Sequence, residues 1–470
     1  MSVTAATTGK ILQEQAVNDF KATLRGKLVR PGDPDYDEER KIFNAMIDKR
    51  PELMVGCAGV ADVISAVNFA QSNNLLVAVR AAGHNVAGIC VCDGGMLIDL
   101  SRMKGIRLDP ATQTIRVEAG LTWGEVNHEL QVFGLAATGG FVSTTGVAGL
   151  TLGGGLGWLV RKHGLALDNL LSADVVTADG RFLTASSTQN QDLFWAIRGG
   201  GGNFGIVTSF EFKVHRAGTV LGGLVFHPLS KGKQALQFWR DFEATAPEEL
   251  TAGALIFNCP PDLPLPDSLR KEPMLAMGGV FTGNLDKGEK ALLPLRQFGP
   301  PEADVIQRMP YQAAQSMADF LFPRRVYNYW KSSYLKSLSD DAIDTIVQYS
   351  ATFPSALTVV VIEHNGGGAM DRISADATAF GHRNWPFNFL VTSIWKDPAD
   401  SDTNIRWTRE FFDAMKPFLA DGAYVNYLGE TGEEGVRAAY GAKYERLATL
   451  KKKYDPGNLF RVNQNIKPAA

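Results

Sequence analysis

A two-domain chain of the α+β class is the fold that the sequence predicts, on three observations. Its 470 residues correspond to two or three domains at about 150 residues each. From about Pro51 onward, helical and strand patterns alternate as in a βαβ arrangement. After about Arg216 glycine becomes sparse, and long helical patterns accompany apolar strands, which is typical of an α+β second domain.

Capping and turn residues mark the elements of the first half. Thr122 and Glu125 form an S/T-x-x-E capping box, which predicts a helix that ends near Phe133. Asp179 and Gly180 form a turn between two strands, which predicts a hairpin. Apolar periodicity supplies the other elements. We expect helices over 61–71 and 191–198, and strands over 75–79, 96–100, 114–118, 173–177, 182–185 and 206–214.

The second half of the chain has longer elements. We expect helices over 232–246, 340–349 and 434–450, and strands over 356–362 and 387–395. In the last of these strands, Asn388, Leu390 and Thr392 share one face because side chains alternate with a period of two.

Composition and charge exclude several classes of protein. Hydrophobic residues make up 45% of the chain and charged residues 21%, as in a folded chain with a large core rather than a disordered one. The 47 basic and 50 acidic residues leave a net charge of −3, which argues against a nucleic-acid-binding protein. The seven histidines are scattered without metal-ligand spacing, so no metal site is expected.

Cysteine usage and the N-terminal residues bear on the compartment. We expect four reduced thiols and no disulfide framework: Cys57, Cys90, Cys92 and Cys259. The first twenty residues contain no apolar run of the signal-peptide kind, which favours the cytoplasm. The uncharged stretch 130–160 is long enough to span a bilayer, but its nine glycines make it poor helix material. A membrane is therefore not expected as a partner.

Two glycine-rich runs point to a bound ligand. A buried strand leads into the small-residue turn Arg80 to Asn85, which presents backbone N–H groups as an anion nest that fits a pyrophosphate. The run Gly146 to Gly157 would let another backbone lie along the same ligand. Taken singly, each run is equally well a set of tight turns. The G-x-G-x-x-G run at 200–205 is not a dinucleotide fingerprint, because a helix precedes it and a strand follows it.

Ordered motifs along the chain resemble those of a known flavoprotein family. They are Arg80-Ala-Ala-Gly-His84, Gly153-Gly-Gly-Leu-Gly157, Arg161-Lys-His-Gly164, Asp192-Leu-Phe-Trp-Ala-Ile-Arg198, Asn203-Phe-Gly-Ile-Val207, Tyr424-Val-Asn-Tyr427 and Tyr454-Asp-Pro-Gly-Asn458. On these motifs, residues 45–470 resemble the berberine-bridge-enzyme-like branch of the vanillyl-alcohol-oxidase superfamily, whose members include oxidases of hydroxynicotine, oligosaccharides and alcohols.

The residue pattern at the N-terminus and the resemblance over the rest together divide the chain into four segments. Residues 1–44 would be an N-terminal helical segment, and 45–216 a PCMH-type FAD-binding domain. Residues 217–423 would form an α+β substrate domain that covers the flavin ring. Residues 424–470 would be a berberine-bridge-like segment that returns to the FAD domain.

The resemblance implies that FAD is bound covalently through His84 alone. A neutral imidazole nitrogen is a competent nucleophile near neutral pH; the alternative is an ordinary surface-loop histidine. Many relatives make a second flavin bond from a cysteine where this chain has Val142, so a single link is expected. The other expected cofactor-binding residues are Arg80, Ala81, Ala82, Gly83, Asn85, Gly88, Thr138, Gly140, Thr145, Gly146, Gly149, Gly153, Gly154, Gly155, Gly157, Val207, Asn463 and Asn465.

The resemblance assigns the substrate chemistry to Tyr427, Tyr424, His163 and Asn388. A tyrosine base requires a strongly lowered pKa. In an extended strand the two tyrosines would face opposite sides, and Tyr427 is preferred because Tyr424 is equally well a packed aromatic. His163 is a base, a polar wall or a structural histidine. Asn388 lies on a strand face without an acid, and Glu363 is a reserve base whose favoured interpretation is a structural ion pair.

The expected activity follows from these assignments. FAD would oxidise a C–H bond that bears OH or N in a small molecule, such as a sugar, an alcohol or a cyclic amine, and O2 would reoxidise the flavin to give H2O2. Thr145 and the surrounding glycines leave little bulk near the ring, which favours an oxidase. The alternatives are a dehydrogenase with another electron acceptor and a non-catalytic flavin carrier.

Overall fold

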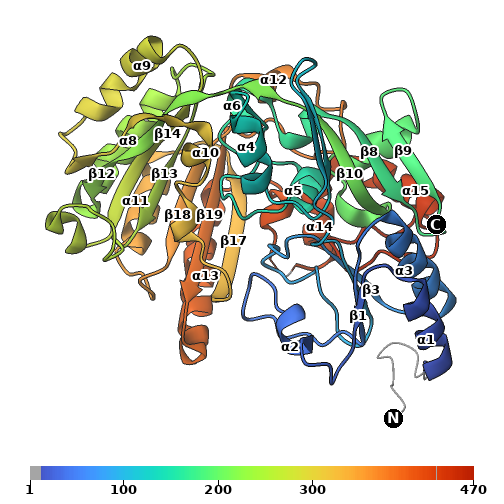
Figure 1. Cartoon of the computed structure of the whole chain (residues 1–470). Helices are drawn as coiled ribbons and strands as arrows, with labels where there is room; N and C mark the ends of the chain where they lie inside the picture. The colour runs from blue at the N-terminus through green and yellow to red at the C-terminus, as the bar shows by residue number, and fades with distance from the viewer. Residues whose placement is uncertain (1–11, 430) are drawn as a thin grey trace.

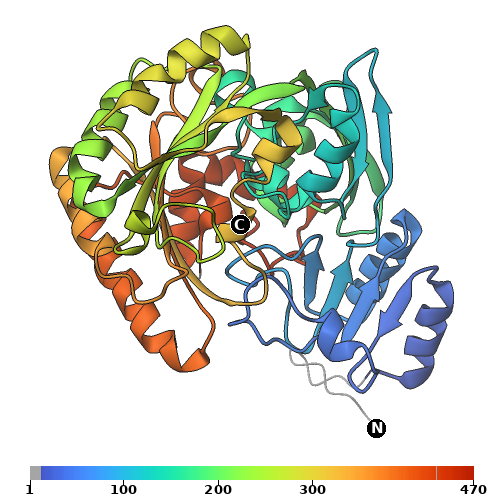
Figure 2. The same ribbon diagram turned by 60° about the vertical axis from the view of Figure 1, so that its left-hand side comes forward.

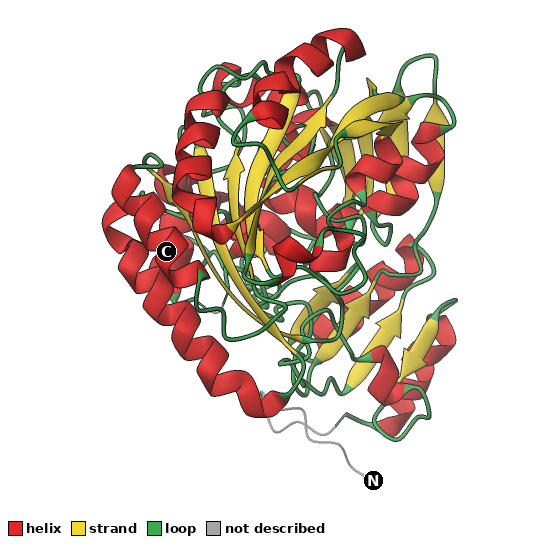
Figure 3. Cartoon of the chain, turned by 90° about the vertical axis from the view of Figure 1, so that its left-hand side faces the viewer, coloured by secondary structure: helices red, strands yellow, loops and turns green. Residues whose placement is uncertain are grey.

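A computed structural model describes residues 12–429 and 431–470, and its strands form four sheets. The largest sheet and its helices occupy one side of the molecule, and the glycine-rich first half of the chain occupies the other (Figure 1). Turning the molecule shows the N-terminal part, in blue, as a separate lobe beside the rest of the glycine-rich half (Figure 2). The mixture of helices and strands confirms the α+β class (Figure 3).

The N-terminal sheet has the strand order β1-β2-β4-β3. Its strands are β1 (Lys27–Val29), β2 (Leu53–Gly56), β3 (Val77–Arg80) and β4 (Met96–Asp99). The helices beside it are α1 (Glu14–Thr23), α2 (Tyr36–Glu39) and α3 (Val60–Ser72). β2 and β3 run parallel to β4, whereas β1 is antiparallel to β2. The segment expected to be helical over 1–44 therefore also supplies a strand, and residues 1–11 lie outside the described residues.

The second sheet is antiparallel with the order β5-β6-β10-β8-β9. Its strands are β5 (Ile106–Asp109), β6 (Thr114–Glu118), β8 (Leu170–Val176), β9 (Phe182–Ser186) and β10 (Ile206–Lys213). The predicted capping box is confirmed: the Glu125 N–H donates to Thr122 Oγ1, and the Thr122 N–H donates to Glu125 Oε2. The predicted hairpin joins β8 to β9, and Gly180 adopts φ +76° at its turn.

Short helices connect these strands and carry the glycine-rich runs. They are α4 (Trp123–Gln131), α5 (Val147–Gly153), α6 (Val160–His163) and α7 (Gln191–Ile197), with the small strand pair β7 (Leu135–Ala136) and β11 (His215–Arg216). As predicted, α7 precedes the 200–205 run and β10 follows it, which is the reverse of a dinucleotide fingerprint.

The large sheet has the order β15-β12-β14-β13-β18-β19-β17, and β16 pairs with β12 at the edge. Its strands are β12 (Thr219–Pro228), β13 (Leu250–Phe257), β14 (Met274–Phe281), β15 (Ala303–Asp304), β16 (Gln307–Pro310), β17 (Tyr327–Leu335), β18 (Val359–His364) and β19 (Phe387–Trp395). The accompanying helices are α8 (Gly232–Glu243), α9 (Leu285–Gln297), α10 (Tyr311–Gln315), α11 (Asp340–Ser350), α12 (Ala369–Arg372) and α13 (Ser401–Met415).

Alternation along the central strands divides the large sheet into two apolar faces. Ile362 and Phe389 pack with Trp239 of α8 in the core between the sheet and its outer helices. Val361 and Leu390, one position away, belong to a separate cluster on the opposite face. Because side chains alternate along a strand, Val361 and Leu390 point away from the outer helices and toward the glycine-rich half. This inner face forms one wall of the site described below.

The C-terminal tail crosses back to the first half of the chain. A 3₁₀ turn (Val425–Tyr427) is followed by α14 (Glu433–Tyr440) and α15 (Tyr444–Tyr454), and α15 packs against α7, where the Tyr454 hydroxyl donates to Asp192. The single helix expected over 434–450 is wrong, because Gly441 adopts φ +53° and separates the two helices.

No helix within the described parts of the chain combines the length and the apolar character that crossing a membrane requires. The uncharged stretch 130–160 forms the end of α4, the strand β7, the helix α5, the start of α6 and loops instead of one long helix.

Candidate active site

A cavity lies between the first half of the chain and the inner face of the large sheet. The expected cofactor residues that line it are Ala81, Ala82, Gly83, His84, Asn85, Gly140, Val142, Thr145, Gly146, Gly149, Gly153, Val207 and Asn463. The large-sheet half contributes Leu224, Ala252, Gly253, Leu255, Met317, Ala318, Phe320, Leu321, Phe322, Trp330, Val361, Glu363 and Leu390. Tyr427 lines the cavity from the C-terminal tail.

The turn after β3 has the form of an anion nest. Among the described residues, no group accepts a hydrogen bond from the backbone N–H of Ala81, Ala82 or Gly83. Gly83 adopts φ +69°, a conformation that favours glycine. Arg80 does not line the cavity, because its buried guanidinium pairs with Asp99 at 2.8 Å and donates to a backbone carbonyl. Arg80 thus anchors the turn from behind, and the free N–H groups suit an anionic ligand.

His84 lines the cavity at the end of this turn. Its ring stacks on Phe43 with centroids 4.2 Å apart, and its Nε2 lies 3.4 Å from Thr144 Oγ1. Burial lowers the pKa of His84 to about 4, and the charge of Arg324 acts in the same direction. The imidazole is therefore neutral at pH 7, which is the protonation state that a nucleophile requires.

The second glycine run divides into lining and packing residues. A Cβ on Gly149 would meet nothing within 4 Å, whereas one on Gly146 would lie 2.7 Å from the Ala82 Cβ. Gly154, Gly155 and Gly157 do not line the cavity, because their backbones pack tightly against Tyr424, Ala166 and Gly139 respectively. These three glycines therefore allow close packing of the chain and do not contact the cavity, unlike the cofactor role expected for them.

Three other expected cofactor residues lie away from the cavity. Gly88 packs against Ile47, where a Cβ would come within 2.7 Å of that side chain. Thr138 accepts from the Asn169 amide. Asn465 is half-buried and does not line the cavity, although its Oδ1 is buried without a hydrogen-bond partner among the described residues. A local contact therefore explains Gly88 and Thr138, whereas no contact within the described residues explains the buried oxygen of Asn465.

Buried polar atoms without partners fit a ligand in this cavity. Asn463 Oδ1 and Gln464 Nε2 have no hydrogen-bond partner among the described residues, and both residues line the cavity. Buried polar groups rarely stay unpaired. Together with the nest at 81–83, they form a donor and acceptor set that suits the pyrophosphate and polar groups of a dinucleotide such as FAD.

Glu363 is the acidic group on the opposite wall. It lies at the end of β18, and Tyr427 Oη donates to its Oε1 at 2.8 Å. The Asn388 amide on β19 donates to Oε2 at 2.9 Å, and the Ser332 hydroxyl donates to Asn388 Oδ1. Burial raises the pKa of Glu363 to about 7, although the hydrogen bonds from Asn388 and Tyr427 lower it. A carboxyl group with that pKa exchanges protons readily near neutral pH.

The structural ion pair favoured for Glu363 is wrong. No cation pairs with Glu363 in the part of the chain that the structure describes, and its partners are the neutral side chains of Asn388, Tyr427 and Asn365. Asn388 does not reach the cavity itself, because its side chain is fully buried between Glu363 and Ser332. Asn388 therefore orients the carboxyl group instead of contacting a ligand.

The two tyrosines of the tail have different surroundings. The 3₁₀ turn brings their rings to 4.9 Å, so the extended arrangement expected from the sequence is wrong. Tyr424 Oη accepts from the Gly155 N–H at 2.8 Å and from the Asn426 amide, and burial raises its pKa to about 12. Burial, followed by the charge of Glu363, holds the pKa of Tyr427 well above its usual range. Neither tyrosine is prepared to act as a phenolate.

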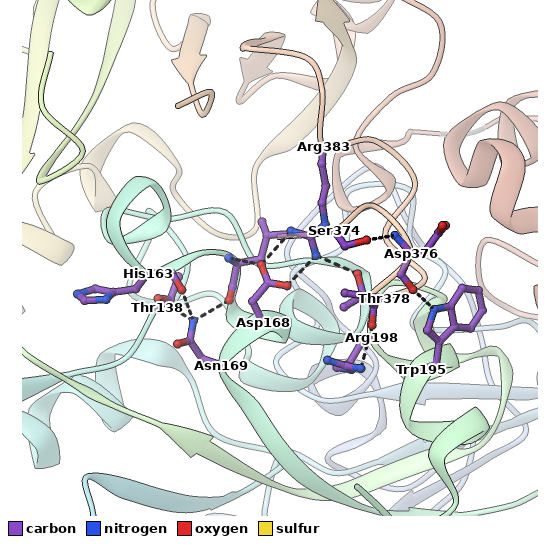
Figure 4. Close-up of polar contacts among 12 residues, drawn as sticks. Thr138, His163, Asp168, Asn169, Trp195, Arg198, Ser374, Asp376, Thr378 and Arg383 are labelled. Carbon is purple, nitrogen blue, oxygen red and sulfur yellow. Dashed lines mark hydrogen bonds and ion pairs between the residues drawn. The ribbon is translucent and has the colours of Figure 1, made fainter. Parts of the chain in front are cut away.

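His163 lies outside the cavity. Its ring stacks on His215 with centroids 3.7 Å apart, and burial lowers its pKa to about 3. Figure 4 shows this ring pointing away from the polar contacts of Asn169, whose amide binds the His163 carbonyl. α6 turns the side chain toward β11, so His163 is a packed residue and not a base for this cavity.

Sequence reasoning missed several residues that shape the cavity. Gly201, Gly202 and Asn203, from the run rejected as a dinucleotide fingerprint, line the cofactor side. Trp330 and Phe320 line the opposite side. The glycine run itself was a usable signal, but nothing local to the two aromatics distinguishes them from core residues.

Comparison with known proteins agrees with this geometry. Residues 51–186 match the FAD binding domain family, and residues 423–467 match the berberine and berberine like family. An FAD-linked oxidoreductase of Dictyostelium discoideum is 31% identical over 456 residues, which cover 97% of each chain. The chain belongs to the berberine-bridge-enzyme-like family of FAD-linked oxidoreductases.

The chain is also similar to a further relative and to a solved structure. (R)-6-hydroxynicotine oxidase of Paenarthrobacter nicotinovorans is 29% identical over 465 residues, which cover 95% of this chain and 97% of that one. The crystal structure of 6-hydroxy-D-nicotine oxidase from Arthrobacter nicotinovorans superposes with a TM-score of 0.86 at 28% identity, and covers 95% of this chain and 98% of that one. This berberine-bridge-enzyme-like protein is therefore an FAD-dependent oxidoreductase with the PCMH-type fold.

Proposed function

We propose that this protein is an oxidase that removes a hydride from a carbon bearing OH or N in a small molecule and uses O2 as the final acceptor. The pairing of Glu363 with Tyr427, across the cavity from the nest at 81–83, carries this proposal. It sets a proton acceptor with a pKa of about 7 in the wall that faces the flavin-binding half. FAD, when bound, supplies the two-electron acceptor that O2 would return to its oxidised form, with release of H2O2.

The residues of this chain would manage the proton. As the hydride leaves the carbon, the X–H proton of the substrate passes to the Glu363 carboxylate, directly or through the Tyr427 hydroxyl, and the C–X single bond becomes C=X. Tyr427 serves in that relay as a donor to Glu363 and not as a phenolate, because its own pKa is raised. Asn388 holds the second carboxylate oxygen, so Oε1 remains the oxygen directed toward Tyr427.

We further propose that FAD is attached covalently through His84 alone. The neutral imidazole lines the cavity next to the nest, which supports its role as the nucleophile. Val142, which lacks a nucleophilic atom, also lines the cavity. The four cysteines are free, and the cytoplasm, where thiols stay reduced, is our proposed location for the protein.

The dehydrogenase alternative differs only in the final electron acceptor. A dehydrogenase would show the same reduction of the flavin by substrate but would need a dye or quinone for turnover. A flavin carrier would show neither. The proton acceptor at Glu363 favours a catalytic protein over a carrier, and the little bulk around Thr145 supports access of O2.

The test combines two measurements on the purified flavoprotein with a panel of alcohols, lactols and cyclic amines. Anaerobic bleaching of the flavin by a panel member is expected for either enzyme. Aerobic turnover with stoichiometric H2O2 is expected for the oxidase. If turnover occurs only with an added dye, the protein is a dehydrogenase and the oxidase proposal is wrong. If the panel neither bleaches the flavin nor turns over, the catalytic proposal is wrong.

A further inference from the structure

The wall of the cavity built by the large-sheet half is almost free of hydrogen-bonding side chains. Glu363 is the one ionisable residue that this half contributes among the described lining residues. Trp330 carries an indole N–H, but this group already donates to Asn328 Oδ1 at 3.2 Å. The rest of the lining from this half consists of aliphatic, aromatic, methionine and glycine residues. A substrate that lies against this wall therefore meets the Glu363 carboxyl group and, beside it, the Tyr427 hydroxyl of the tail.

The strand register explains why the surface beside Glu363 is flat. On the neighbouring strand Gly253 pairs with Glu363 and lines the cavity, so a backbone without a side chain lies next to the carboxyl group. One step along the strands, Val361 pairs with both Leu255 and Leu390. The carboxyl group thus lies between Gly253 on one side and the aliphatic side chains of Val361, Leu255 and Leu390 on the other.

Aromatic residues border the same space. Trp330 lies edge-on to Tyr427 with centroids 6.3 Å apart, and Phe322 lies edge-on to Trp330 at 5.9 Å. Phe320 also lines the cavity yet is 43% exposed, so it lies at the outer end. Its 3₁₀ turn is fixed to the first half by Asp319, which accepts from the N–H and the hydroxyl of Ser143. Aromatic edges and faces suit a flat ring.

We propose, on the basis of the proposed function, that the substrate is a largely apolar ring compound whose single OH or N group is the one that is oxidised, and that carbohydrates are poor substrates. Hydroxyls placed against this wall would lose their water without gaining a partner, which disfavours binding. In hydrophobic pockets one added hydroxyl is rejected by about 100-fold. A monosaccharide carries several hydroxyls besides the reacting one, and the described lining at this wall offers them no polar side chain beyond Glu363 and the adjacent Tyr427 hydroxyl.

The decisive comparison uses two lactols with the same reacting carbon. Tetrahydropyran-2-ol has the ring and the C1–H of glucose but none of its other hydroxyls. Measured by anaerobic flavin reduction, its kcat/KM is expected to exceed that of D-glucose by at least about 100-fold. 1-Phenylethanol and 2-phenylpyrrolidine, tested beside it, distinguish an alcohol from an amine. If the kcat/KM of glucose or cellobiose is within about threefold of that of tetrahydropyran-2-ol, the inference is wrong. The proposed function would still stand in that case.

A binding measurement keeps the inference testable without turnover. Tetrahydropyran and methyl glucoside, neither of which carries a free lactol, are titrated against the flavin absorption spectrum of the same holoprotein. Tighter binding of tetrahydropyran than of methyl glucoside supports the inference. It does so even if no panel member is oxidised, because a lack of oxidation would contradict only the proposed function. Equal or tighter binding of methyl glucoside overturns the inference.

A substitution in the wall provides an independent test. Val361→Thr keeps the shape of the side chain but adds a hydroxyl beside the cavity, so the preference for tetrahydropyran-2-ol over glucose is expected to fall by about tenfold. Val305→Thr is the matched control, because Val305 is 42% exposed and does not line the cavity; it should leave the ratio unchanged. An unchanged ratio in Val361→Thr, with an unaltered melting temperature, contradicts the inference.

Discussion

At the scale of single residues, Glu363 combines burial with neutral partners. Its side chain is 5% exposed, and the Tyr427 hydroxyl and the Asn388 amide donate to its two oxygens. Burial opposes ionisation and the hydrogen bonds favour it, and the balance sets the pKa to about 7. The group thus changes its protonation state within the range where enzymes are assayed.

The pH dependence of flavin reduction should follow Glu363. The carboxylate accepts a proton only when ionised, so the rate at saturating substrate is expected to rise about tenfold per pH unit below pH 7 and to level off above it. Glu363→Gln should lower the rate by about 100-fold to 10,000-fold and remove this pH dependence. Stopped-flow absorbance measures both, with exposed Glu410→Gln as the control. A Gln variant that keeps the wild-type profile contradicts the assignment.

The two tyrosines should respond differently to loss of the hydroxyl. Tyr427→Phe removes a donor to Glu363, so the pH profile is expected to move to higher pH and the reduction rate to fall. Tyr424→Phe leaves the buried Gly155 N–H without its acceptor, which costs about 1–3 kcal/mol of stability with a smaller effect on the reduction rate. Thermal melting and stopped-flow reduction separate the two effects. If both variants reduce the flavin within about threefold of wild type, neither tyrosine takes part in the proton transfer.

Loss of the His84 imidazole should release the flavin. The wild-type protein is expected to stay yellow after acid precipitation, because a covalent bond survives unfolding, whereas His84→Ala should lose its colour to the supernatant. His128→Ala, at an exposed histidine of α4, is the control and should stay yellow. Mass spectrometry of the flavin peptide checks the position of the link, and a flavin bound to any cysteine refutes the single-histidine proposal.

At the scale of elements, one segment of the large-sheet half binds across the first half. Arg383 makes two hydrogen bonds to Asp168 at 3.0 and 2.6 Å, and both side chains are almost completely buried. Trp195 of α7 donates to the Asp376 carbonyl, and Arg198 donates to the Ala377 carbonyl. Figure 4 shows these contacts converging from the two halves. The segment 374–383 therefore fixes the two walls of the cavity relative to each other.

Breaking the buried pair should destabilise the fold strongly. Asp168→Asn leaves the Arg383 charge buried without its counter-charge, and such a loss costs about 3–5 kcal/mol. Differential scanning calorimetry is expected to show a melting temperature lower by several degrees. Asp344→Asn breaks an exposed pair with Lys233 and should change the melting temperature little. Equal shifts in the two variants would show that the buried pair does not hold the halves together.

At the scale of the whole molecule, the cavity combines segments that lie far apart in the chain. It extends from the turn at 81–85 to Phe460 and Gln464 of the C-terminal tail, and the large sheet closes its other side. A cavity assembled in this way suits a ligand longer than a mononucleotide. The free N–H groups at 81–83 supply the site for a pyrophosphate, which FMN lacks.

FAD should therefore be bound and FMN should not. His84→Ala protein freed of flavin is expected to regain the absorption of a bound flavin when FAD is added, and to remain unchanged with an equal concentration of FMN. The mass of the flavin peptide from the wild type provides a second measurement. A peptide that carries FMN would contradict the assignment of the turn as a pyrophosphate site.

The sequence by itself determined many of the local elements, and most of the residues that it assigns to the cofactor line the cavity. The capping box at Thr122, the turn at Gly180 and the strand patterns predict the observed elements because hydrogen bonds and apolar periodicity within a few neighbours decide them. The cofactor-side turn was predicted for the same reason, since His84 and its nest are consecutive residues. The division of the chain into four domains remains a prediction.

Only the tertiary structure decided the catalytic side. Tyr427 and Asn388 are 64 and 25 residues away from Glu363 in the chain, and the pairing of β18 with β19 and the return of the tail bring them together. The pKa of Glu363 depends on that burial, so no local pattern distinguishes it from an ion-paired glutamate. His163 was misplaced for the same reason: its motif fixes a short helix, but the neighbouring strand β11 determines that the ring packs against His215.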